Sequence, residues 1–239
     1  MVDISSCEGL LKCYRNELVP ENPNIPDNGV RGLLLYRLKC GKGRHPDSCL
    51  TNENTKWISL KLYGAISESQ DTIFNAWSLI KIYDAIHYGI GKTRDDRSVF
   101  NSIDKGEDVF LPEHKEEFDK LADRQHCIAN FMPAPKGFNG FGSYHGKGEY
   151  DCDNDFPDVY YKRAKKEFPQ MYKWINDNMD NYCLQLFQSE ITGWENHKAY
   201  YQKLKDNISE KDIYEIAVRM NKLLEERASG LLKKSNLAF

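Results

Sequence analysis

Side chains of catalytic type stand inside an apolar run near the middle of the chain. His126 and Asn130 are interspersed with apolar residues, and the run ends at two prolines, Pro133 and Pro135. An unpaired polar group in a protein interior costs about 1–3 kcal/mol. We therefore predict that both side chains are mostly buried and hydrogen-bonded, and that they fix the turn that precedes Pro133.

A second set of polar residues has the types that metal-assisted hydrolysis requires. Glu113 and His114 are adjacent, and Asn139 and His145 follow, with His126 between the two pairs. A histidine can take a proton from water while an asparagine orients it, and a second histidine with a carboxylate can hold a divalent metal ion that stabilises the leaving oxygen. These are the working parts of an HNH-type nuclease.

Part of this region is similar to known sequences. The segment His126-Cys-Ile-Ala-Asn-Phe-Met-Pro-Ala-Pro-Lys-Gly-Phe-Asn139, followed by Tyr160-Tyr-Lys162, resembles the H-x-x-G-N-(apolar)-P…N…K segment of certain uncharacterised bacterial proteins. Residues 113–162 are similar, more distantly, to the HNH-like C-terminal nuclease domain of modification-dependent restriction systems.

This resemblance implies roles for individual residues. Glu113 and His145 would bind the metal ion, His114 would be the general base, and Asn139 would be its orienting partner. His126 belongs to the same set of catalytic candidates. The resemblance also implies a bacterial setting and an association with phage defence or counter-defence.

The segment from Lys136 to Gly148 combines five glycines with three aromatic residues. Glycine lets a backbone approach a ligand closely, and exposed aromatic rings can stack on bases or pack against a partner. A plain surface loop is the alternative interpretation. If the segment is a contact surface, its binding residues are Lys136, Phe138, Phe141, Tyr144 and Lys147.

Two further patterns resemble parts of metal sites. The alternating acidic residues of 149–155 resemble part of a calcium loop but lack the closing glutamate. Cys40, His45 and Cys49 have no second pair of ligands nearby, which structural zinc normally needs. We therefore expect no bound cofactor, except a divalent metal ion if the chain is a nuclease.

The composition is that of a soluble globular protein, with 40% hydrophobic and 29% charged residues. No apolar run approaches the roughly 20 residues of a membrane span, and no secretory signal is visible. The seven cysteines lack C-x-x-C spacing, so we expect free thiols and a cytoplasmic protein without a membrane partner. A net charge of −3 gives no global attraction to nucleic acid, and we interpret the cations of 39–44 and 160–166 as solvated faces.

Apolar spacing predicts a single, mainly helical domain over residues 1–239. Helices at 67–88, 169–189 and 209–229 should bury the core, the last one capped by Ser209 with Asp212 and stopped by Gly230. Shorter helices are expected at 4–18, 112–127 and 194–205 and from about Pro157. Two stretches rich in strand-forming residues, 30–38 and 57–63, predict a minor β-hairpin.

We interpret these features as those of a non-enzymatic, cytoplasmic interaction protein of a bacterium or mobile element. Its partner should be a macromolecule, a protein in the first instance and nucleic acid as the alternative. The other functional hypothesis is a metal-dependent HNH-like nuclease or another nucleic-acid-processing enzyme. Geometry separates the two, because the enzyme requires His114, Asn139 and His145 to converge in one cleft.

Overall fold

The computed structural model is mainly α-helical, as the sequence predicts. It describes residues 3–18, 28–39, 69–87, 99, 101–103, 105, 109–134, 157–167, 169–191 and 208–235. Within these ranges, no helix is both long and apolar enough to span a lipid bilayer.

The described elements are α-helices, short 3₁₀ turns and one sheet of two short strands. The α-helices are α1 (Cys7–Leu11), α2 (Arg15–Leu18), α3 (Gly29–Lys39), α5 (Ala76–His87), α7 (Pro112–Arg124), α8 (Pro157–Glu167), α9 (Pro169–Asp177) and α11 (Glu210–Ser235). Two 3₁₀ turns, η1 (Ile128–Asn130) and η4 (Gln185–Gln188), and two strands, β1 (Ser69–Thr72) and β2 (Phe131–Ala134), complete the described elements.

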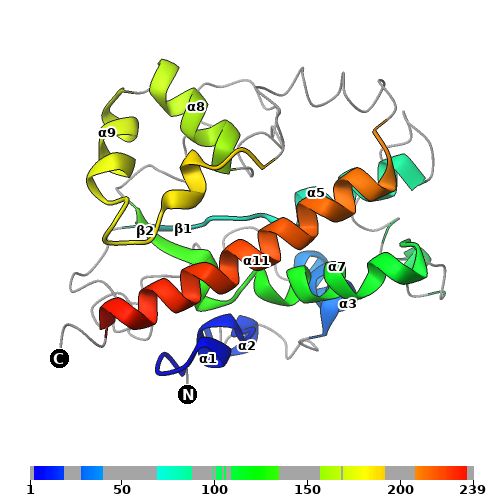
Figure 1. The fold of residues 1–239 in the computed structure, drawn as a ribbon. Helices are drawn as coiled ribbons and strands as arrows, with labels where there is room; N and C mark the ends of the chain where they lie inside the picture. Colours follow the sequence, from blue (N-terminus) through cyan, green and yellow to red (C-terminus); the bar gives the residue numbers. More distant parts are fainter. Residues whose placement is uncertain are drawn as a thin grey trace.

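Helix α11 crosses the whole molecule and organises the other elements (Figure 1). It contacts α5 and α7 along its length, and it contacts α1 and η1 near its C-terminal end. In this view, α8 and α9 lie on the other side of α11 from α1 and α2. One core cluster contains side chains from α3, α5, α7, α8, α9 and α11, so these helices share a continuous apolar interior.

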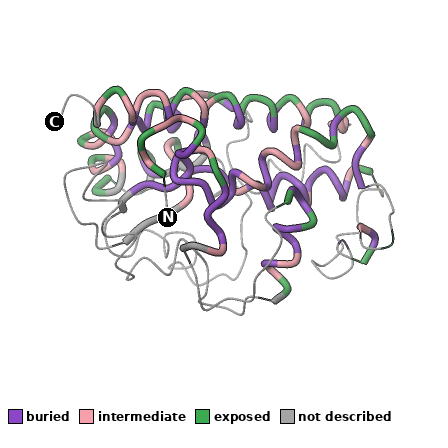
Figure 2. The backbone as a smooth tube through the Cα atoms, turned by 90° about the horizontal axis from the view of Figure 1, so that it is seen from below, coloured by how far each residue is buried: buried purple, intermediate pink, exposed green. Residues whose placement is uncertain are grey.

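The predicted C-terminal helix is confirmed and is longer than expected. Its 26 residues span about 39 Å at about 1.5 Å per residue. Ser209 and Asp212 form a reciprocal cap: the Ser209 N–H donates to Asp212 Oδ2 at 2.7 Å, and the Asp212 N–H donates to Ser209 Oγ at 3.3 Å. The apolar stripe is buried, while exposed residues lie on the outer edge of this long helix (Figure 2).

The prediction that Gly230 ends this helix is wrong, because the helix continues to Ser235. A β-carbon at position 230 would lie 3.0 Å from Cys183 Sγ. Glycine therefore permits a close approach of the chain at Cys183, whose own backbone has a positive φ of 52°. Gly230 is therefore explained by close packing against Cys183 and not by the end of a helix.

The predicted β-hairpin is wrong in its first strand. Residues 30–38 belong to α3, and 57–63 lie outside the described residues. The two strands that do form are far apart in sequence: β1 and β2 are antiparallel, from Ser69 opposite Ala134 to Thr72 opposite Phe131. Helix formation at α3 is supported by α7, since carboxylates of Asp119 and Asp123 accept the Val30 and Gly29 N–H groups at 2.9 and 2.7 Å.

Several predicted boundaries also change. Residues 69–72 of the expected helix 67–88 form β1, and the helix begins at Ala76. The expected helix 169–189 ends at Asp177 and is followed by turns and η4. The 4–18 segment contains α1 and α2 with an extended break at residues 13 and 14. Helices near 112–127 and from Pro157 are confirmed, and 194–205 lies outside the described residues.

Candidate functional site

Asn130 joins the turn after α7 to the segment that precedes α5. Its Oδ1 accepts the Phe74 N–H at 2.8 Å, and its Nδ2 donates to the Phe74 carbonyl at 2.9 Å and to the Gln125 carbonyl at 3.1 Å. Its own backbone carbonyl accepts the Ile73 N–H at 2.8 Å. The side chain, which is 1% exposed, thus prolongs the β1–β2 pairing by one step.

His126 occupies the same turn and is held by Arg15. The Arg15 Nε–H donates to His126 Nδ1 at 3.0 Å, and Arg15 Nη2 donates to the Ala122 carbonyl at 3.2 Å. Because the guanidinium has only donors, Nδ1 of His126 must accept, which places the neutral imidazole proton on Nε2. The ring also packs edge-on against Tyr36, with centroids 4.9 Å apart. The prediction that His126 and Asn130 are buried and hydrogen-bonded is confirmed.

A second buried arginine reaches the same turn from α11. Arg227 is 2% exposed, and its Nη1 donates to the Ala129 and Phe131 carbonyls at 2.5 and 2.6 Å. Its Nε donates to the Tyr182 carbonyl at 3.1 Å. Arg227 of α11 therefore satisfies the Ala129 and Phe131 carbonyls at the end of this turn, while Arg15 of α2 holds the His126 ring and a carbonyl of α7. The sequence predicts neither role.

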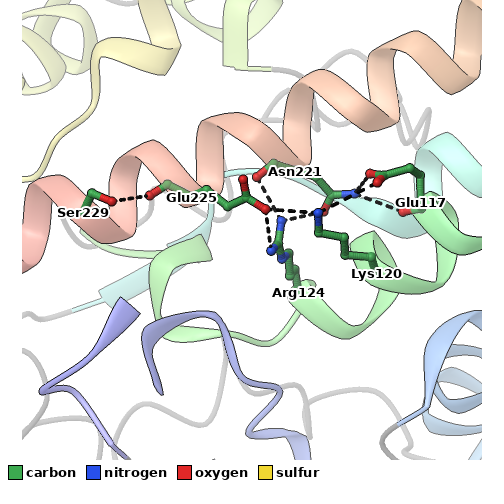
Figure 3. Close-up of polar contacts among 6 residues, drawn as sticks. All are labelled: Glu117, Lys120, Arg124, Asn221, Glu225 and Ser229. Carbon is green, nitrogen blue, oxygen red and sulfur yellow. Dashed lines mark hydrogen bonds and ion pairs between the residues drawn. The ribbon is translucent and has the colours of Figure 1, made fainter. Parts of the chain in front are cut away.

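A polar seam joins α7 to α11 (Figure 3). Arg124 donates to the Asn221 carbonyl at 3.0 Å and to Glu225 Oε1 at 2.8 Å, and Lys120 lies 3.0 Å from the same carboxylate oxygen. Partial burial opposes ionisation of Glu225, but the hydrogen bonds from Arg124 and Lys120 outweigh it and lower the pKa of that carboxyl. The Asn221 amide donates back to Glu117 Oε2 at 2.8 Å, so the seam is reciprocal.

His114 lies at the other end of α7 and is packed among aromatic rings. Its Nδ1 lies 2.9 Å from Tyr83 Oη, which also accepts the Leu111 N–H at 3.2 Å. The imidazole stacks on Tyr214 with a centroid distance of 4.3 Å and an interplanar angle of 14°. Burial raises the pKa of Tyr83. His114 is only 7% exposed, whereas the neighbouring Glu113 is exposed.

The described candidates for nuclease chemistry do not meet. His114 and His126 lie at opposite ends of α7, and the ten residues of helix from 114 to 124 alone span about 15 Å. Across the described ranges, no group of three or more histidine, cysteine or acidic side chains is arranged to hold a metal ion. Asn139 and His145 lie outside the described residues, so their place relative to His114 stays a prediction.

The predicted contact loop also lies outside the described residues. This applies to all five of its proposed binding residues, Lys136, Phe138, Phe141, Tyr144 and Lys147. The acidic residues of 149–155 and the Cys40, His45 and Cys49 group lie outside them as well.

A cationic surface on α8 and α9 is the main feature that folding adds. Lys162, Lys165 and Lys166 of α8 and Lys173 of α9 are all exposed; we call these four residues the α8–α9 surface. Lys165 Nζ lies 5.9 Å from the centroid of the half-buried Tyr172 ring. Two of the lysines have acidic neighbours, since Lys162 lies 3.7 Å from Glu190 and Lys173 lies 2.5 Å from Asp177.

The same two helices carry two half-buried tyrosines, Tyr161 of α8 and Tyr172 of α9. Tyr161 Oη lies within hydrogen-bond distance, 3.1 Å, of both Tyr172 Oη and Asn176 Oδ1, and the two tyrosine rings are 5.0 Å apart. This network fixes α8 against α9 and holds the rings in place. The sequence predicts a solvated face for the cations of 160–166 and does not join them to Lys173, because that residue follows a second helix start at Pro169.

The chain matches no protein-family model, no curated protein and no solved structure.

Proposed function

We propose that this chain is a non-enzymatic binding protein whose α8–α9 surface contacts an acidic region of a protein partner. The supporting observations are that two packed helices carry four exposed lysines, and that one of them, Lys165, lies over the half-buried Tyr172 ring, which packs on Tyr161. Aromatic rings give an interface rigid contact area, and surrounding cations select an anionic partner and speed its approach.

A protein partner is favoured over nucleic acid for an electrostatic reason. The whole chain carries a net charge of −3, which opposes the long-range attraction that phosphate backbones require. Two of the four lysines are also partly neutralised by Glu190 and Asp177. Such a mixed surface suits a limited acidic patch on a protein. We place this function in the cytoplasm of a bacterium or a mobile element's host, in phage defence or counter-defence.

The nuclease remains the alternative proposal, with His114, His126 and Asn139 as catalytic residues and Glu113 and His145 as metal ligands. In that case Tyr83 and Tyr214 would hold the His114 ring through Nδ1 and one ring face, and Nε2 would be the nitrogen that takes the proton. Cleavage of supercoiled, linear or single-stranded DNA by the purified chain with Mg²⁺ or Mn²⁺, lost in His114→Ala, would favour the enzyme.

The binding proposal is tested by reversing charge on the surface. The full chain carrying Lys165→Glu and Lys166→Glu is compared with the wild type for capture of proteins from cells that carry its gene. A matched control reverses two exposed lysines of α11, Lys211→Glu and Lys222→Glu. We expect the control to retain the same protein as the wild type, and the α8–α9 variant to bind it at least about tenfold more weakly.

The salt dependence of binding and a test with nucleic acid show which results would contradict the proposal. Binding of the captured protein should weaken as ionic strength rises, since the contact lies near the surface and is screened. Equal losses in both double variants would reject a specific role for α8 and α9. Binding of labelled single-stranded or double-stranded oligonucleotides is measured by fluorescence anisotropy. If the wild type binds them and only the α8–α9 variant binds more weakly, the partner is nucleic acid and not protein.

A further inference from the structure

Cys13 and Cys127 lie directly opposite each other although they are far apart in the sequence. They form an antiparallel bridge between the extended break after α1 and the turn after α7. The Tyr14 N–H donates to the His126 carbonyl at 3.1 Å, so the hydrogen bond flanks the cysteine pair instead of joining it. In such a non-hydrogen-bonded pair the Cα atoms are about 4.5 Å apart and both side chains point to the same face.

This geometry is compatible with a covalent link. Disulfides form across Cα separations of about 4.4–6.8 Å, and the separation expected for this pair lies within that range. Both residues are buried, Cys127 completely, and both are reduced in the structure. The other described cysteines have different neighbours: Cys7 lies 3.6 Å from the Ser229 hydroxyl, and Cys183 lies against Gly230.

We propose that Cys13 and Cys127 form a reversible disulfide when the protein meets a hydroperoxide. The bond would join the N-terminal segment covalently to the turn that contains His126 and Asn130. The disulfide would hold together the two segments that carry Arg15 and His126, and so would stabilise the hydrogen bond between these side chains. This inference stands independently of the α8–α9 surface.

The chemistry balances with the hydroperoxide as the two-electron oxidant. The Cys13 thiol gives up its proton and its sulfur attacks the terminal peroxide oxygen; the O–O bond breaks, and the departing hydroxide or alkoxide takes up that proton and leaves as water or an alcohol, so that Cys13 becomes a sulfenic acid. The Cys127 sulfur then attacks the Cys13 sulfur, the S–O bond breaks, and hydroxide leaves with the Cys127 proton as water. Cys13 is assigned the first step because complete burial raises the pKa of the Cys127 thiol to about 11.

Trypsin separates the two cysteines into distinct peptides, residues 13–15 and residues 125–136. The full chain is treated with hydrogen peroxide, its remaining thiols are alkylated, and its peptides are identified by mass spectrometry. We expect these two peptides to be recovered as one species with two hydrogen atoms fewer, and a reducing agent to separate them. The link closes a loop of more than a hundred residues, so the melting temperature should rise by about 5–15 °C.

Variants make the assignment specific. Cys13→Ala should remove the linked species and the rise in melting temperature, and Cys127→Ala should do the same. Cys183→Ala is the matched control from the same apolar cluster as Cys127 and should retain both. If Cys127→Ala does not fold, Cys13→Ala and the wild-type peptide map decide alone. Recovery of both peptides unlinked, or of either one joined to another cysteine, would overturn the proposal.

Discussion

Asn130 does with its side chain what a strand residue does with its backbone. A carboxamide has one carbonyl and one amino group, and these accept from the Phe74 N–H and donate to the Phe74 carbonyl at 2.8 and 2.9 Å. An extra donor proton reaches the Gln125 carbonyl. The residue type is therefore set by the need to satisfy three backbone groups at once in a place that water does not reach.

Replacing Asn130 tests this arrangement. Asn130→Ala leaves the Phe74 N–H and two carbonyls unpaired, so we expect the free energy of unfolding to fall by about 1–3 kcal/mol in urea denaturation. Asn130→Asp has nearly the same shape but replaces the donating amino group by a buried charge, and it should cost more. An aspartate variant as stable as the wild type would show that the amide donors contribute nothing.

Arg227 should be among the least replaceable cations in the described chain. Arg227→Met keeps much of the volume but leaves the Ala129 and Phe131 carbonyls without their donor, and we expect a loss of about 2–4 kcal/mol, because charged hydrogen bonds are stronger than neutral ones. Arg219→Met, on the exposed face of the same helix, should change stability by less than about 0.5 kcal/mol. Thermal and urea unfolding of both variants give the comparison.

In the turn between α7 and β2, the sequence predicts the buried polar residues but not the arginines that contact this turn. His126 and Asn130 stand in an apolar run, so their burial and their need for partners followed from the cost of an unpaired polar group. Arg15 and Arg227 could not be predicted in the same way. Each resembles a surface cation among its sequence neighbours, and its acceptors lie more than forty residues away along the chain, at His126 and Ala122 for Arg15 and at Ala129, Phe131 and Tyr182 for Arg227.

At the scale of elements, local pattern succeeded where a helix supplies its own ends. Helix α11 begins at a reciprocal Ser209–Asp212 cap, and both partners are visible in the sequence. Helix α3 was predicted as a strand because Val30 to Leu38 is rich in apolar residues that also suit sheets. Its first N–H groups are satisfied by Asp119 and Asp123 of α7, and a partner of this kind cannot be read from a local window.

The burial of α11 can be tested at two neighbouring positions. Ile216 is 8% exposed on the inner face, and Val218 is 37% exposed on the outer face. Ile216→Asp places a charge in the apolar core and should unfold the protein, whereas Val218→Asp should shift the melting temperature by only a few degrees. The melting temperatures of the two variants are compared by circular dichroism. Equal decreases would mean that burial of the inner face does not determine the effect of a charge in this helix.

For the molecule as a whole, carboxylates at helix ends and in the α7–α11 seam make the free energy of unfolding depend on pH. Hydrogen bonds with Ser209 lower the pKa of Asp212, and hydrogen bonds from Arg124 and Lys120, against burial, lower that of Glu225. A carboxyl whose pKa is lower in the folded state stabilises the fold above its unfolded pKa, and this contribution disappears as pH falls through the folded value. The loss therefore belongs below about pH 4.5.

Glu225→Gln should isolate one part of that acid dependence. We expect the variant to be less stable than the wild type near neutral pH, and its free energy of unfolding to decline less steeply between about pH 5 and about pH 3. Glu226→Gln is the control, since its ion pair with Lys222 is longer, at 4.0 Å, and well exposed. Urea denaturation over the pH series measures both slopes, and identical slopes for wild type and Glu225→Gln would contradict the assignment.

The small apolar cluster beneath α11 has a consequence for how the chain is made. Leu10 and Tyr14 pack there with Ala228 and Leu231, so its two sides are separated by more than two hundred residues. At about 5–20 residues per second of synthesis, the first side waits roughly 10–40 s for the second. During that interval Leu10 and Tyr14 lack the part of the cluster that α11 supplies. A ribosome-bound nascent chain should therefore expose the segment of Leu10 and Tyr14 to proteases and chaperones until α11 emerges.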